Sequence, residues 1–344
     1  MPGLGIPIEV GAEFIHGEAE ATYALLHRAR IPSVIANREQ RSPRLSKIDS
    51  FAEARRAVQG AKLDKDVSFE EFLSTRKIPA KTKAFARMMV EGFDAADPKR
   101  VSAKSIIEEW ASLGAQPRPQ GGYGALMDWM TRTVLRKGAR LRLESPVHDL
   151  RWRRGSVQAN GIRAKRAIVA LPLPLIRLKE KRDALRKLAM GPVIRVALAF
   201  DEEFWRKRTT GAAFFHNPRA SFPTFWTPLP MRAPLLTCWA GGPKAARLAG
   251  KNLIDEALQS VRTVFGRLPP LMGAIVQDWR ADRWSRGGYS YVLVGGEGAR
   301  EELALPIQET LFFAGEATDA EEAGTVAGAL RSGQRAAKEI LERD

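Results

Sequence analysis

The chain of 344 residues, 44% of them hydrophobic, is long enough for two domains with a sizeable core. Its single cysteine, Cys238, excludes an internal disulfide and fits a reducing compartment, from which we expect a cytoplasmic protein. The net charge of +16 is spread among acidic and apolar residues without a nucleic-acid-binding motif, which favours an arginine-rich solvated surface over a nucleic-acid groove.

The first part of the chain is predicted to be mainly helical. Residues 1–17 are Gly-rich and partly β-like, and the pattern from about 20 to 115 is helical. "SFEEFLSTR" places Ser68 and Glu71 at the spacing of a capping box, which predicts a helix start. A loop from Pro117 to Gly122 then leads into "GYGALMDWMTRTVLRKG", which predicts an amphipathic helix.

Strands dominate the middle of the chain. "ARLRLESPVHDLRWRRGSVQANGIRAKRAIVAL" predicts two β arms around a turn near Gly155, and its end, "AIVAL", is typical of a strand buried on both faces. "VIRVALAFDEEFW" alternates as a further strand, and residues 212–242 are aromatic, proline-rich and β-like. "NLIDEALQSVRTVFG" predicts a helix and "GAIVQDW" a strand. We expect one discontinuous α/β domain with an α+β domain inserted.

The closing stretch, Phe312 to Leu341, predicts a strand, a sharp turn and a helix. "LFFAG" suits a central strand, Gly315 permits the turn, and Glu316 emerges at the strand's carboxyl edge. The small residues from Gly324 to Ala329 would let a flat ring approach the positive end of the helix dipole. A plain crossover with close packing explains the pattern equally well. The inward helix face is predicted to carry Val326, Leu330, Gly333, Ala337 and Ile340.

"LFFAGEAT…GTVAGALRSGQRAA" resembles the C-terminal flavin-binding motif of the flavin-dependent amine oxidases, which include monoamine and polyamine oxidases and the flavin histone demethylases. Other segments resemble blocks of that family in family order: "IEVGAEFIHG", "VEGFDAADPKRVSA", "RPQGGYGALMDWM", "SPVHDL", "AIVALPLPLIR", "MGPVIRVALAFDEEFW" and "VQDWRADRWSRGGYSYV". The resemblance therefore covers essentially the whole chain.

The resemblance implies the α/β fold of the FAD-linked oxidases, with two domains. A truncated, Rossmann-like FAD-binding domain would be discontinuous and comprise residues 1–20, 121–180 and 290–344. An α+β substrate domain would comprise residues 21–120 and 181–289. The cofactor would be FAD, and the partners would be a small-molecule amine and oxygen.

Carried to this sequence, the resemblance implies three catalytic residues: Arg195, Tyr289 and His16. Tyr289 would form one side of an aromatic cage that guides a neutral amine, and His16 would face the amine pocket. Tyr289 could instead be a core tyrosine, and His16 a surface residue.

The same resemblance implies a set of FAD-binding residues: Gly11, Ala12, Phe14, Val147, Trp279, Trp284, Gly315, Glu316, Gly324, Thr325 and Val326. Val147 would contact the adenine, and Glu316 the ribityl or pyrophosphate region. The N–H groups of Thr325 and Val326 would meet the pyrimidine edge of the ring. The two tryptophans would wall the ring, or serve only in packing.

The sequence departs from the family pattern at three points. Family members begin with a strand, a GxGxxG turn and a helix that hold the pyrophosphate, whereas this chain starts after that unit, so we expect an N-terminally truncated member. Arg195 replaces a lysine that holds water near the flavin and assists reoxidation; an arginine keeps the charge but not the geometry or the proton transfer. Thr325 stands where monoamine oxidases have a second cage tyrosine.

Three hypotheses follow for the activity. The first is an FAD-dependent oxidoreductase that oxidises an amine to an imine by hydride transfer, with reoxidation by oxygen. The second is a truncated, catalytically inactive relative that cannot hold FAD alone. The third, based on charge alone, is a nucleic-acid-binding protein. We expect no membrane partner, because no apolar run could span a bilayer, and no metal, because the histidines lack ligand spacing.

Overall fold

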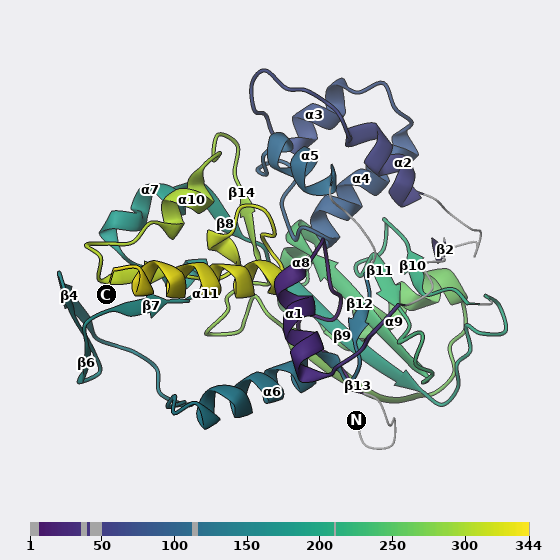
Figure 1. The fold of residues 1–344 in the computed structure, drawn as a ribbon. Helices are drawn as coiled ribbons and strands as arrows, with labels where there is room; N and C mark the ends of the chain where they lie inside the picture. The colour runs from purple at the N-terminus through teal and green to yellow at the C-terminus, as the bar shows by residue number, and fades with distance from the viewer. Residues whose placement is uncertain (1–6, 36–39, 42–49, 112–115, 210, 344) are drawn as a thin grey trace.

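The computed structural model describes residues 7–35, 40–41, 50–111, 116–209 and 211–343 (Figure 1). The α-helices are α1 (Glu20–Ala29), α2 (Ser50–Val58), α3 (Phe69–Thr75), α4 (Ala80–Gly92), α5 (Ala103–Ala111), α6 (Gly122–Arg136), α7 (Arg182–Arg186), α8 (Gly242–Arg247), α9 (Leu253–Phe265), α10 (Ala299–Ala304) and α11 (Val326–Leu341). Three short 3₁₀ helices are η1 (Leu173–Leu175), η2 (Lys179–Lys181) and η3 (Glu316–Thr318). The described helices include none with the length and apolar character needed to cross a bilayer.

The strands form several sheets within the described residues. They are β1 (Ser33–Val34), β2 (Gln40–Arg41), β3 (Arg118–Pro119), β4 (Leu150–Arg153), β5 (Ser156–Ala159), β6 (Ile162–Ala164), β7 (Ala167–Val169), β8 (Leu188–Met190), β9 (Val193–Phe200), β10 (Phe214–His216), β11 (Thr224–Trp226), β12 (Leu235–Gly241), β13 (Leu271–Asp278), β14 (Ser290–Val292) and β15 (Leu311–Phe313). The largest sheet has the order β13-β9-β12-β11-β10-β2, and its longest pairs are antiparallel. The molecule is thus mixed α/β.

Alternation along the central strands gives the large sheet two different faces. Val196, Cys238, Phe225 and Phe215 pair in a row across β9, β12, β11 and β10, and they belong to the main hydrophobic core with α9. The neighbouring positions point to the opposite face. That second face carries polar and aromatic side chains, and it forms one wall of the candidate site described below.

A second core lies among the helices of the N-terminal half. Phe69, Phe72, Phe85 and Trp110 are buried in the cluster that joins α2, α3, α4 and α5, which gather above the large sheet in Figure 1. The predicted helix start at Ser68 is confirmed, because its hydroxyl accepts a hydrogen bond from the Glu71 N–H at 3.2 Å. This helical layer covers the large sheet through α4.

Three expectations about the strands were wrong. Residues 139–149 contain no strand, although β4 and β5 do turn at Gly155 as predicted. Ile168, the second residue of "AIVAL", is 43% exposed, and β7 pairs only with β15 among the described strands. Because β15 pairs only with β7 among the described strands, it is not the central strand of a larger sheet, although all three of its residues are buried. The strand predicted in "VIRVALAF" is confirmed as β9, and both of its faces are buried.

The predicted strand–turn–helix at the end of the chain is confirmed, with one correction. β15 is followed by a turn at Gly315, whose φ is +117°, and by η3 and α11. The most buried positions of α11 are Ala327, Gly328, Ser332 and Ala336, and not the face predicted from Val326, Leu330, Gly333, Ala337 and Ile340. Small residues face inward because α11 lies close to the Glu322 backbone and to β15. Val326 and Leu330 instead face the cavity described next.

Candidate functional site

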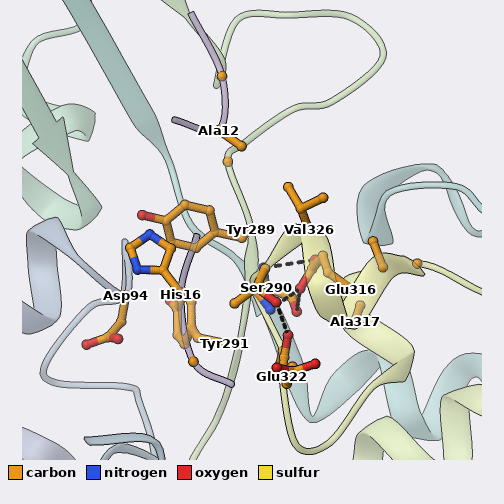
Figure 2. A pocket seen from close by; sticks show the side chains of 18 of the residues that line it. Ala12, His16, Asp94, Tyr289, Ser290, Tyr291, Glu316, Ala317, Glu322 and Val326 are labelled. Atoms are coloured by element: carbon orange, nitrogen blue, oxygen red, sulfur yellow. Dashed lines mark hydrogen bonds between the residues drawn. The ribbon is translucent and has the colours of Figure 1, made fainter. Parts of the chain in front are cut away.

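A cavity of about 1520 Å³ lies where residues 11–18, the large sheet and the start of α11 meet (Figure 2). Twelve of the predicted site residues line it: Gly11, Ala12, Phe14, His16, Arg195, Trp279, Tyr289, Gly315, Glu316, Gly324, Thr325 and Val326. Val147 and Trp284 do not, and they are 60% and 47% exposed. The fold therefore brings together residues that lie more than 300 positions apart in the sequence.

The start of α11 forms a small-residue mouth on this cavity. Thr325 caps the helix: its hydroxyl accepts a hydrogen bond from the Gly328 N–H at 3.0 Å and donates one to the Glu322 carbonyl at 2.6 Å. A Cβ at residue 328 would lie 2.1 Å from the Glu322 carbonyl oxygen, so glycine is required there. The first N–H groups of the helix lack partners within it and carry the positive end of its dipole.

Glu316 holds the loops beside this mouth together. Its carboxylate accepts hydrogen bonds from the Ser290 N–H at 3.1 Å, the Ser290 hydroxyl at 2.7 Å and the Gly324 N–H at 3.0 Å (Figure 2). Arg300 donates to the Ser290 hydroxyl and carbonyl, and it lies 4.0 Å from the Glu316 carboxylate. In this structure Glu316 is therefore engaged with protein groups.

A buried ion triad lies behind the Gly11–Ala12 segment. Glu13 bridges Arg195 and Arg118, and it also accepts a hydrogen bond from the Trp226 indole at 3.0 Å. Arg195 donates to the Gly11 carbonyl at 3.1 Å, which ties the triad to the cavity wall. Burial opposes ionisation of Glu13, but the facing Arg195 and Arg118 outweigh it and lower the pKa of its carboxyl. The triad thus carries one net positive charge.

Aromatic rings line the cavity from His16 toward the large sheet. His16 and Phe93 meet edge to face, with ring centroids 5.1 Å apart, and Phe14 lies 5.7 Å from both Phe214 and Trp226. The Tyr289 hydroxyl donates to the Gly92 carbonyl at 3.5 Å. Figure 2 shows the His16 and Tyr289 rings between Asp94 and the start of α11. These rings form an apolar channel toward the mouth.

Two carboxyl groups that sequence reasoning missed, those of Asp94 and Glu109, line the same cavity. They are hydrogen-bonded to each other, and Asp94 also accepts from the Trp110 indole at 3.3 Å. Burial and the neighbouring Glu109 raise the pKa of Asp94 well above its usual value, and burial raises the pKa of Glu109. Both shifts favour a state in which one proton lies between the two carboxyls.

Burial and nearby carboxyl groups determine the protonation of the Tyr289 hydroxyl. Burial and the carboxyls of Asp94, Glu109 and Glu316 raise the pKa of its hydroxyl well above the usual value, so Tyr289 remains a neutral phenol. Within the described residues, no group of three His, Cys, Asp or Glu side chains is placed to hold a metal ion. The site is therefore built from aromatic, carboxyl and guanidinium groups around a helix N-terminus.

Sequence patterns also left out Glu13. Its signal is a carboxylate flanked by Ala12 and Phe14 in the mostly apolar segment "IEVGAEF", where a buried charge needs a cationic partner. The partners are 105 and 182 residues away in the sequence, so the pairing is visible only in the fold.

Comparison with known proteins gives a match over nearly the whole chain. A family model described as flavin-containing amine oxidoreductase matches residues 1–341. Lysine-specific histone demethylase 2 of Homo sapiens is 32% identical over 247 residues, which cover 64% of this chain and 29% of that protein. Polyamine oxidase 2 of Arabidopsis thaliana is 29% identical over 289 residues, which cover 74% of this chain and 55% of that protein. The chain thus spans less than two thirds of the length of these relatives.

Solved structures resemble the whole fold. A putrescine oxidase bound to putrescine superposes with a TM-score of 0.80 at 18% identity and covers 98% of this chain and 88% of its own. Cyclohexylamine oxidase from Brevibacterium oxydans IH-35A superposes with a TM-score of 0.77 at 17% identity, with the same coverage. At these identities the likeness concerns the arrangement of elements.

Proposed function

The chain belongs to the flavin-containing amine oxidoreductase family, and from this premise we propose that it oxidises an amine to an imine, with oxygen as the final acceptor. Family membership confirms the predicted fold class and FAD as the cofactor. When bound, FAD would supply the acceptor for the hydride that leaves the amine α-carbon. The domain boundaries given above stay a proposal.

The observation that carries this proposal is the ring-sized opening at the start of α11. Gly324 has room beside Tyr289, since a Cβ there would lie 3.8 Å from the tyrosine ring. Gly11 and Ala12 face the same space without bulk, and the Trp279 indole holds their segment in place by donating to the Val10 carbonyl at 2.7 Å. The residues present therefore fit a flat, three-ring cofactor at this end.

The chain's own groups have distinct proposed roles around that ring. The N–H groups of Thr325 and Val326 would bind the electron-rich pyrimidine edge, where the helix dipole favours negative charge. Arg195, fixed between the Gly11 carbonyl and Glu13, would place a permanent positive charge behind the ring. Arg195 would therefore act by its charge and not by proton transfer.

The aromatic channel would select and dehydrate the amine. Tyr289 and His16 would flank the reacting carbon, and the rings behind them would keep water from the mouth. Because Tyr289 remains a neutral phenol, it would orient the amine and would not act as its base. The reacting amine must be neutral to release a hydride.

A second candidate, a chain that does not retain FAD by itself, is favoured by one observation. The residues expected to bind the far end of FAD do not converge: Val147 lies outside the cavity, and Glu316 is already bound to Ser290 and Gly324. Under this alternative the described part of the chain would hold the ring weakly and would not turn over.

Reconstitution with FAD, followed by anaerobic addition of an amine, tests the proposed function. We expect the yellow protein to bleach, and oxygen to restore its colour with release of hydrogen peroxide. Ala12→Trp should block the ring site and abolish bleaching, whereas Ala249→Trp, at an exposed position away from the cavity, should not. Folded protein that does not take up FAD would support the alternative, and protein that takes up FAD but never bleaches with an amine would contradict the proposed oxidation.

A further inference from the structure

The excess positive charge of the chain is concentrated in one segment. Residues 132–187 hold seventeen of the 55 lysine and arginine residues but only four of the 39 acidic residues, so most of the net charge of +16 arises there. Twelve of the seventeen are arginines. The segment contains β4, β5 and β6, which form a three-stranded antiparallel sheet at the left edge of the molecule in Figure 1.

The inner face of this small sheet is apolar. Trp152, Val157 and Ala164 pair in one row across β4, β5 and β6. Val157 is buried in a cluster with Leu311 and Phe313 of β15, and Trp152 packs against the same cluster. This face therefore attaches the sheet to the body of the molecule, and the alternate positions on the three strands point away from it.

The outer face carries cations on its two outer strands and none on the strand between them. Arg151, Gln158 and Arg163 pair in the next row across the sheet, and Arg153 pairs with Ser156 on the same face. β4 and β6 are two strand spacings apart, which corresponds to roughly 10 Å. The outer face therefore presents arginines in two lines, with only serine and glutamine side chains between them.

These cations are exposed and have few acidic partners. Arg153, Arg163 and Lys165, which directly follows β6, are exposed, and none of them forms an ion pair within the part of the chain that the structure describes. Arg151 contacts Asp149 at 3.1 Å, but its side chain is 77% exposed, and ion pairs of this kind contribute little. The positive charge of this face is therefore available to an anionic ligand.

A nucleic-acid duplex matches this arrangement more closely than a single strand or a membrane. The minor and major grooves of B-DNA are about 6 and 12 Å wide, so arginines in two lines roughly 10 Å apart can reach the phosphates on both sides of one groove. Arginine also binds phosphate through two parallel hydrogen bonds. A single strand is held by base stacking on aromatic rings, but Trp152 lies on the inner face. Membrane surfaces favour apolar side chains beside the charges, and the paired residues of the outer face are arginine, serine and glutamine.

We propose that the outer face of β4, β5 and β6 binds the phosphate backbone of a nucleic-acid duplex without reading its sequence. Ser156 and Gln158 would donate hydrogen bonds to phosphate oxygens between the two lines of arginines. The affinity would come mainly from the release of counterions. None of the outer-face residues lines the cavity, so this binding is a second activity that does not depend on the proposed amine oxidation.

A solvated arginine-rich surface without a partner makes a different prediction. Its net charge would attract polyanions weakly and without regard to position, so the loss of any three exposed arginines would have the same effect. A binding face instead responds to which three arginines are removed.

The test titrates the full chain into a fluorescein-labelled DNA duplex of arbitrary sequence and follows the anisotropy at several concentrations of sodium chloride. In the triple variant Arg151→Gln, Arg153→Gln, Arg163→Gln we expect the Kd at low salt to rise about tenfold or more. The slope of log K against log salt concentration should become shallower by about 2–3, since each phosphate contact contributes about 0.9 to it.

The matched control removes the same number of arginines elsewhere. Arg206, Arg262 and Arg267 are exposed and lie outside residues 132–187, so their triple change to glutamine gives the same net charge. This control variant should bind the duplex like the parent protein. Thermal unfolding of both variants should match that of the parent protein, since all six positions are exposed.

Three results would overturn the proposal. The first is a parent protein that leaves the anisotropy of the duplex unchanged at low salt. The second is an equal loss of affinity in the two triple variants, which would reduce the effect to net charge. The third is tighter binding of a single strand, or of phosphatidylserine vesicles, than of the duplex, which would assign the face to another partner.

Discussion

Glu13 shows how one side chain supports the position of a whole loop. Its carboxylate is shared by Arg195, Arg118 and Trp226, and both arginine side chains are almost fully buried. Removing one partner from such a group leaves a buried charge without compensation, which costs more than the pair contributes. The Gly11 carbonyl is bound to the same cluster through Arg195, so the ring site depends on it as well.

Glu13→Gln should therefore lower the free energy of unfolding by about 3–5 kcal/mol. Urea denaturation at pH 7 measures this loss. Glu309→Gln, which removes an exposed partner of Arg154, is the control and should leave the urea midpoint nearly unchanged. Equal midpoints for the two variants would show that the triad does not stabilise the fold.

The ion triad around Glu13 could not be predicted from the sequence, although several residues beside it were. The resemblance placed Arg195 and Phe14 at the ring site, and both line the cavity. Glu13 and Asp94 were missed, because their importance lies in partners that are distant in sequence or in a neighbouring helix. A buried carboxylate has no local pattern, since its cost is offset only by tertiary contacts.

At the scale of elements, the capping-box spacing of Ser68 and Glu71 correctly predicted where α3 starts. Ser68 begins α3 and Asn252 caps α9, where its side chain accepts from the N–H groups of Ile254 and Asp255. Strand environment was predicted less well. "AIVAL" has the composition of a doubly buried strand, yet Ile168 is 43% exposed, because burial depends on which strands lie alongside and not on the residues of the strand itself.

The cap of α11 joins helix stability to the proposed ring site. Thr325→Val removes the hydroxyl that accepts from the Gly328 N–H, so it should lower stability by about 1 kcal/mol. Thr325→Ser keeps the hydroxyl and should restore it. Thermal unfolding of the two variants measures the effect, and riboflavin affinity should fall with the first alone. If Thr325→Val is as stable as the parent protein, the cap does not define the start of α11.

The Asp94–Glu109 pair couples the end of α4 to α5 through a shared proton. The pKa of each carboxyl is raised in the folded state. Above a pH of about 4–5 this pair therefore binds more protons in the folded protein than in the unfolded chain. Stability is therefore expected to fall as pH rises from that range through the folded-state pKa of the pair. Asp94→Asn removes one of the two carboxyls while keeping an acceptor for Trp110.

Asp94→Asn should accordingly be more stable than the parent protein at pH 8, and the difference should shrink at pH 5. Urea midpoints at the two pH values measure it. Asp64→Asn, a substitution outside the cavity-lining residues, controls for the general effect of removing a carboxylate. A parent protein whose midpoint rises between pH 5 and pH 8 relative to Asp94→Asn would contradict the shared proton.

At the scale of the molecule, the cavity and the surface have opposite electrostatic character. The chain has a net charge of +16, but nine acidic residues and three arginines line the cavity. The acidic ones are Glu13, Glu18, Glu20, Asp94, Glu108, Glu109, Glu316, Glu321 and Glu322. Groups inside a cavity act at short range, whereas the surface charge is screened within about 8–10 Å in physiological salt. The local field should therefore favour an ammonium ion.

The salt dependence of the KM for an amine distinguishes the effect of the acidic cavity from that of the basic surface. If the acidic cavity governs capture, added salt should raise the KM for an amine, because it screens the attraction. If the basic surface governs capture, added salt should lower the KM by screening repulsion. Steady-state kinetics of the FAD-loaded protein between about 0.02 and 0.5 M sodium chloride distinguish the two, with a neutral sugar at matched osmolality as the control.

The most direct test of the ring site is the binding of riboflavin, which carries the ring without the adenine end. The residues proposed to bind the ring line the cavity, whereas Val147 does not. Titration of the purified chain should therefore quench riboflavin fluorescence to saturation, with a Kd within about tenfold of that for FAD, while AMP should not compete. Folded protein that leaves riboflavin fluorescence unchanged, or from which AMP displaces the ring, would contradict a flavin site at the start of α11.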